Sequence, residues 1–123
     1  MKPTPIVCAA AALIALPLSA AHAQSRASFQ GIGMFRTASP GSQAWGISAD
    51  GKTIVGQSVS DPGPQAFRWT AGDGMVGLGD LSGGPFASLA SAANADGSVI
   101  VGFGKSAASG TNYEAFRWSA GRR

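Results

Sequence analysis

The 123-residue sequence is poor in the residues that carry most enzyme chemistry. It contains one cysteine and one histidine, Cys8 and His22, and charged residues make up only 12% of it. Both of these residues precede the point at which we expect the chain to be cleaved. The cleaved chain then offers neither a thiol nor an imidazole. This excludes Ser-His and cysteine nucleophiles, zinc sites built on His or Cys, and disulfides.

Long apolar stretches are also lacking, except at the start of the chain. An apolar run from Ile6 to Leu18 is followed by "SAAHAQ", which has the small residues of a secretory cleavage site. The run is too short to cross a hydrocarbon core of roughly 30 Å as a helix. The pattern predicts a signal-peptide helix over residues 1–23, cut between Ala23 and Gln24 by the secretion machinery. No later segment has the length and hydropathy of a membrane span, so we expect a secreted, periplasmic or cell-surface protein.

Charge gives little indication of a partner. Eight basic and six acidic residues remain after cleavage, a net charge of +2, and they are scattered along the chain. So weak a balance does not favour nucleic acid. The glycine-rich stretch "GLGDLSGG" (Gly77 to Gly84) has Ser82 where a dinucleotide fingerprint needs its third glycine. We therefore expect no nucleic-acid partner and no cofactor.

The carboxylates form no recognisable catalytic or metal-binding set. Asp50, Asp73 and Asp96 each precede a glycine, which is typical of turns. One Asp per turn is too few for a calcium site, which needs six or more oxygen ligands. Glycoside cleavage by a carboxylate pair stays open, with Asp61, Asp80 and Glu114 as the side chains to test. The composition as a whole favours a protein that is not an enzyme.

Two phrases occur twice in the sequence and define an internal repeat. "ADGKTIVG" (Ala49 to Gly56) returns 46 positions later as "ADGSVIVG" (Ala95 to Gly102), and "AFRW" at Ala66 returns 49 positions later at Ala115. Setting Phe29 against Met75 also aligns "FQGIGMF" with "MVGLGDL". The offset grows from 46 to 49 because the second copy has three extra residues within "GKSAASGTNYE". A loop is expected there, because three residues inserted into a strand would move the following side chains to its other face.

Each copy reads as about four short strands joined by turns. The repeated turns are predicted at Asp50-Gly51 and Asp96-Gly97, since Asp bonds its own backbone and Gly accepts positive φ. Strands are expected over residues 52–59, 65–70, 75–79 and 87–93, with "DLSGGPF" as a loop.

Four strands in 40 to 50 residues is the period of a propeller blade. We therefore predict an all-β fold of blade-like four-stranded repeats, a β-propeller fragment of about two blades, preceded by the signal-peptide helix. The expected organisation is signal peptide (1–23), linker (24–28), repeat 1 (29–74) and an incomplete repeat 2 (75–123). Propellers close with four to eight blades. We thus expect either a fragment of a longer product or chains that complete one another.

The order of these phrases resembles the HAF family of bacterial extracellular repeats. "GLGDLSGG" (Gly77 to Gly84) and "EAFRWS" (Glu114 to Ser119) are the most similar stretches, and the resemblance runs from about Phe29 onward. "FQGIGMFRTASPG" departs from the family pattern in the first copy. The resemblance implies export and a repeat architecture, and it implies no enzymatic activity.

Aromatic residues recur at fixed positions of the repeat. Phe67 and Trp69 return as Phe116 and Trp118, and their alternation predicts core residues on one strand face. The arginines between them are expected on the opposite face, solvated or paired with a carboxylate. Trp45 has Ser91 as its counterpart, so it is expected either to stack on a sugar ring or to fill a gap in the core.

These observations predict an exported β-repeat protein with a structural, adhesive or binding role at the cell surface or outside the cell. The alternative is a carbohydrate-binding or carbohydrate-active propeller fragment. Its expected partners are another copy of itself, another repeat chain, or a surface polysaccharide. Two blades leave outer faces open, so the mature chain alone is not expected to be a stable monomer.

Overall fold

The computed structural model describes residues 1–5 and 26–121. The predicted signal-peptide cleavage site at Ala23 and Gln24 lies outside the described residues. Within the described ranges, no helix has the length and hydropathy needed to cross a membrane.

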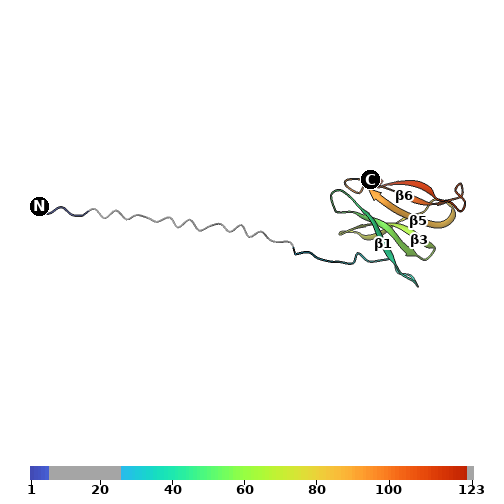
Figure 1. Cartoon of the computed structure of the whole chain (residues 1–123), viewed down its shortest axis with the longest axis horizontal. Coiled ribbons are helices and arrows are strands. Elements are labelled where there is room, and N and C mark those ends of the chain that lie inside the picture. Colours follow the sequence, from blue (N-terminus) through green and yellow to red (C-terminus); the bar gives the residue numbers. More distant parts are fainter. Residues whose placement is uncertain (6–25, 122–123) are drawn as a thin grey trace.

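The described part of the chain folds into two antiparallel sheets and contains no helix, which confirms the all-β prediction. The first sheet has four strands in sequence order, and the second has three (Figure 1). The described residues form no closed propeller. The strands are β1 (Ser42–Ile47), β2 (Ile54–Ser60), β3 (Gly63–Thr70) and β4 (Gly74–Gly79) in the first sheet, and β5 (Gly83–Ala93), β6 (Val99–Ser106) and β7 (Glu114–Ser119) in the second.

Local sequence explains the tight turns of the first sheet. Gly51 and Gly74 adopt φ of 72° and 71°, a region that L side chains rarely enter. Asp50 holds the β1–β2 turn, since its carboxylate accepts hydrogen bonds from the Ser48 hydroxyl (2.5 Å) and from the backbone N–H of Lys52 (3.0 Å). The backbone therefore turns where the Asp-Gly pairs predict.

Strand β5 begins earlier than the sequence indicates. "GGPF" was expected to be a loop, but it forms the start of β5. Gly83 pairs with Ser106, and pairing resumes only at Ser88, so Pro85 lies in a bulge where no backbone donor is needed. The Asp80 carboxylate supports this entry, because it accepts a hydrogen bond from the N–H of Ala87 at 2.8 Å.

The repeat in the sequence is also a repeat in three dimensions. Residue Ala44 lies opposite Gly56 in the first sheet as Ala90 lies opposite Gly102 in the second, and in both cases a bulge follows. An ideal Cβ placed on Gly56 or on Gly102 would lie 1.9 Å from a backbone oxygen of the neighbouring strand. Neither position leaves room for a side chain, so the same close strand approach is built twice.

The connections into β1 and β5 match as well. The Ser42 hydroxyl donates to the Gly33 carbonyl at 2.8 Å, and the Ser88 hydroxyl donates to the Gly79 carbonyl at 2.6 Å. Gly33 and Gly79 share a positive φ, 88° and 85°. Ser42 and Ser88 are 46 residues apart, and so are Gly33 and Gly79, which is the offset of the repeat.

The sheets do not divide where the sequence repeat divides. The boundary between the two sheets falls between Gly79 and Gly83, whereas the second sequence copy begins at residue 75. Strand β4 belongs to the first sheet by pairing with β3. Residues 28–33, which align in sequence with β4, form no strand.

The core lies between the two sheets. Strand β5 packs against β1, β2 and β3, and Figure 1 shows it lying close to the first sheet. The fully buried centre consists of Val55, Ala66, Ala90 and Ile100. Partly buried apolar residues surround it, namely Leu78, Ala93, Phe116 and Trp118.

Candidate functional site

Strand β3 is buried on both of its faces. Ala66 and Phe67 are each 0% exposed, although they point in opposite directions from the strand. Ala66 packs on the second sheet, so Phe67 and the half-buried Trp69 lie on the outer face of the first sheet. Phe67 is buried, as expected of a core residue, and the opposite face is buried too at Ala66, because a second sheet covers it.

The aromatic pair of the second copy faces the first sheet. Phe116 and Trp118 are partly buried against the core between the sheets. Arg68 lies on the other side of this interface, with its guanidinium carbon 5.8 Å from the centroid of the Trp118 ring. The same guanidinium pairs with the Asp73 carboxylate at 2.9 Å. Arg68 thus bridges a carboxylate and an aromatic ring, an arrangement worth about 0.5–1 kcal/mol at partly exposed sites.

Trp45 lies at the β-bulge of β1 and is 58% exposed. Its counterpart Ser91 lies at the matching bulge of β5. A bulge leaves one residue out of the ladder, and here it turns the Trp45 side chain to the surface. The expectation that Trp45 fills a gap in the core is therefore wrong, and stacking on a ligand is the alternative that its position allows.

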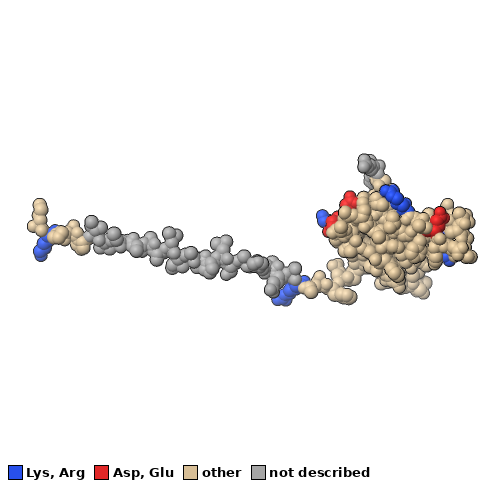
Figure 2. Space-filling view, turned by 45° about the horizontal axis from the view of Figure 1, so that its top comes forward, with Lys and Arg blue, Asp and Glu red and all other residues tan. Residues whose placement is uncertain are grey.

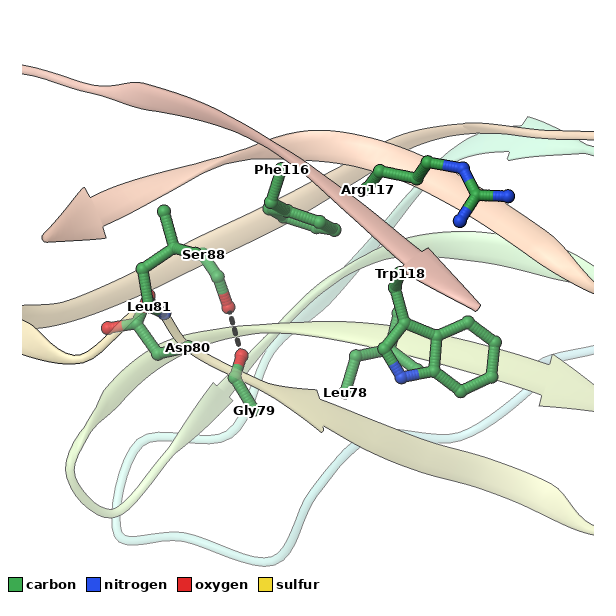
Figure 3. A pocket seen from close by; sticks show the side chains of 8 residues that line it. All are labelled: Leu78, Gly79, Asp80, Leu81, Ser88, Phe116, Arg117 and Trp118. Atoms are coloured by element: carbon green, nitrogen blue, oxygen red, sulfur yellow. Dashed lines mark hydrogen bonds between the residues drawn. The ribbon is translucent and has the colours of Figure 1, made fainter. Parts of the chain in front are cut away.

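A cleft opens at the edge of the interface between the sheets (Figure 3). Its volume is about 140 Å³, well below the roughly 300–1,000 Å³ typical of small-molecule sites. In Figure 3 the Trp118 indole lies beside Leu78, and Arg117 is directed away from them. The residues lining the cleft are Leu78, Gly79, Asp80, Leu81, Ser88, Phe116, Arg117 and Trp118.

Two further hollows lie on the first sheet, and they too are lined by few titratable side chains. One, of about 290 Å³, includes Arg36 and Asp61 at its border, and the other, of about 210 Å³, lies over β1 and β2. Neither holds a cluster of titratable groups. Across residues 1–5 and 26–121, no three His, Cys, Asp or Glu side chains come together in a way that could hold a metal ion.

Two of the three carboxylates considered for glycoside cleavage, Asp80 and Glu114, have structural partners. Asp80 accepts from the N–H groups of Leu81 and Ala87, both at 2.8 Å. Glu114 accepts a short hydrogen bond from the Ser106 hydroxyl. Asp61 lies in the turn between β2 and β3 and is exposed.

The two repeated Asp-Gly turns contact each other. The N–H of Asp50 donates to the Ala95 carbonyl at 3.0 Å, and Gly97 adopts φ of 74°. A hydrogen bond from the Ser48 hydroxyl, and then one from the Lys52 N–H, lower the pKa of Asp50 below 3.8. The hydroxyl and N–H of Ser98 lower the pKa of Asp96 in the same way. Both carboxylates are therefore ionised turn residues at neutral pH.

The outer face of the second sheet, which was expected to be open, carries an apolar surface made of residues that were not predicted from the sequence. Val101 is 44% exposed and Phe103 37% exposed. Tyr113 meets Phe103 edge to face with ring centroids 5.0 Å apart, and the Lys105 amine lies 5.1 Å from the Tyr113 centroid. The alternation in "VIVGFG" and the three-residue insertion that carries Tyr113 are the signals that could have indicated it.

The surface carries few charges, as its composition requires. Figure 2 shows the few basic and acidic side chains dispersed over a largely uncharged body. Comparison of the chain with known protein families, with curated proteins and with solved structures finds no match.

Proposed function

We propose that this chain is an exported β-repeat protein with a structural or adhesive role at the cell surface or outside the cell. The supporting observation is that β1, β2 and β3 of the first sheet pair in the same order as β5, β6 and β7 of the second, and that β5 packs against the first sheet. Close strand approach at Gly56 and Gly102 serves strand pairing within each sheet, and the paired serine hydrogen bonds hold the connections into β1 and β5. Of the HAF-like phrases, "GLGDLSGG" contains Gly79 and "EAFRWS" forms β7, which fits a blade of the propeller type.

Export is the part of the proposal that a reporter tests directly. Residues 1–40 fused to a β-lactamase lacking its own signal should confer ampicillin resistance, since that enzyme acts only outside the cytoplasm. The matched control carries Leu13→Arg and Leu16→Arg, which place charges in the apolar run. Resistance from the control, or none from the parent fusion, would remove the export half of the proposal.

A carbohydrate-binding role is the second candidate, and the exposure of Trp45 favours it. Aromatic rings stack on sugar faces, and Trp45 presents 58% of its surface beside the polar strand edge of β1. Tryptophan fluorescence that shifts on adding polysaccharide, and that no longer shifts in Trp45→Ala, would promote this candidate over a purely structural role.

A further inference from the structure

The buried face of the first sheet recurs on the second sheet, where no further sheet covers it in the described structure. In the first sheet, Val55 and Ala66 are 0% exposed because the second sheet packs on them. Their counterparts Val101 and Ala115 are exposed, Val101 by 44%. We name this set the stacking face, and it consists of Val101, Ala115 and Arg117, the counterparts of Val55, Ala66 and Arg68.

The complementary face recurs as well. On the second sheet, Ala93, Ile100 and Trp118 pack on the first sheet. Their counterparts lie on the outer face of the first sheet, where Ile47 pairs with Ile54, and Ile54 pairs with Trp69. Ile47 is 60% exposed, and Ile54 and Trp69 are half-buried. We name Ile47, Ile54 and Trp69 the receiving face.

We propose that a second copy of this chain occupies the stacking face, head to tail, through its receiving face. The interface within one chain supplies the template, because both of its halves are present again and each keeps an exposed apolar residue, Val101 on the stacking face and Ile47 on the receiving face. In this arrangement Arg117 of one copy covers Trp69 of the next, as Arg68 covers Trp118 at 5.8 Å within the chain. Val101 then lies against Ile54, as Val55 lies in one cluster with Ile100.

One position at which the copies differ makes the new interface more apolar. Gln57 of the first sheet, which donates to the Ser88 carbonyl at 3.0 Å, is replaced by Phe103 in the second. Within the chain, Gly46 of β1 lies close to the Ser91 backbone because it has no side chain. Its counterpart in the second sheet is Ala92, so β5 of one copy and β1 of the next must lie slightly further apart. Tyr113 covers only the end of the stacking face near Phe103.

Head-to-tail contacts are heterologous, so they build rings or open filaments, and no two-fold dimer. This inference rests on the proposed structural role and deepens it by naming the partner. The association is measured on purified protein, whereas export is measured with a reporter fusion in cells. A negative result in one experiment can therefore be told apart from a negative result in the other.

The test uses the full chain with Cys8→Ser, which leaves no native thiol. One variant adds Val101→Cys on the stacking face, and another adds Ile47→Cys on the receiving face. Both positions are exposed, so the fold should tolerate the changes, and far-UV circular dichroism checks this for each variant. The two proteins are oxidised mildly, alone and as an equimolar mixture, and disulfide-linked species are separated on a non-reducing gel.

We expect the mixture to give at least fivefold more covalent dimer than either protein alone, and the double variant to give a ladder of covalent oligomers. Dimer formed by Val101→Cys alone would overturn the head-to-tail arrangement, because it requires a two-fold contact. Absence of cross-links in the mixture, with monomers in sedimentation at about 1 mM, would overturn self-association altogether.

A charge variant provides a second measurement without cysteines. Arg117→Glu removes the cation that should cover Trp69 of the next copy, and Lys52→Glu makes the same charge change in the exposed β1–β2 turn. Sedimentation equilibrium should show association weakened about three- to tenfold by Arg117→Glu. Equal association constants for the two variants would overturn the proposed contact.

Discussion

The most direct test of this fold is a methyl group added at Gly102. The Cβ of alanine would lie 1.9 Å from the Leu89 carbonyl oxygen and 2.9 Å from the Ala90 Cα, whereas real Cβ contacts under 3.0 Å essentially never occur. Both obstacles are backbone atoms, so no side-chain rotation relieves the clash. Strands β5 and β6 would have to separate by about 1.1 Å, the difference between the observed and the permitted distance.

The cost of that separation can be bounded. Overpacking costs about 1–3 kcal/mol, and each backbone hydrogen bond that is stretched beyond use costs about 1 kcal/mol. We expect Gly102→Ala to lower the free energy of unfolding by about 2–4 kcal/mol, out of the roughly 5–15 kcal/mol of a typical domain. The melting temperature should fall by about 10 °C or more.

The measurement is urea unfolding followed by circular dichroism at one fixed protein concentration, since association shifts apparent stability. Gly72→Ala is the matched control, because nothing lies within 4 Å of its added Cβ and its φ is not positive. Gly56→Ala should cost the same as Gly102→Ala to within about 1 kcal/mol, since its Cβ meets the Gln43 carbonyl at the same 1.9 Å. If Gly102→Ala were as stable as Gly72→Ala, the close strand pairing described here would be refuted.

Three further predictions concern the core, the turns and the surface. Ile100→Ala should lower the free energy of unfolding by about 2–5 kcal/mol in urea titrations, because Ile100 is 0% exposed, while Val101→Ala should cost below about 1 kcal/mol; equal costs would contradict the assigned strand faces. The lowered pKa of Asp50 and of Asp96 stabilises the fold above the unfolded value near 3.8, and this stabilisation is lost as pH falls through the lower folded pKa. Asp50→Asn should therefore weaken the dependence of the melting temperature on pH below about 4, and an unchanged dependence would argue against these hydrogen bonds. Trp45→Ala should leave the melting temperature within about 2 °C of the parent, since Trp45 is 58% exposed, and a larger drop in calorimetry would show that it packs in the core.

Interactions between neighbouring residues were sufficient to predict the repeat and the positions of its turns. A turn needs only a residue that accepts positive φ and a side chain that bonds the adjacent backbone, and Asp50-Gly51 provides both within a few residues. The strand compositions around "TIVG" and "AFRW" likewise act locally, so β2 and β3 lie close to where the sequence predicts them. The turns and strand centres needed no tertiary information.

Tertiary structure alone decided which faces are buried. Alternation along β3 places Ala66 and Phe67 on opposite faces of the strand. It does not indicate that a second sheet covers Ala66, because that burial depends on residues more than 20 positions away in the sequence. The same holds for Trp45, whose exposure follows from a bulge in the pairing of β1 with β2. Val55 and Val101 show the reason most plainly: they occupy the same place in the repeat, and only the position of the second sheet makes one 0% and the other 44% exposed.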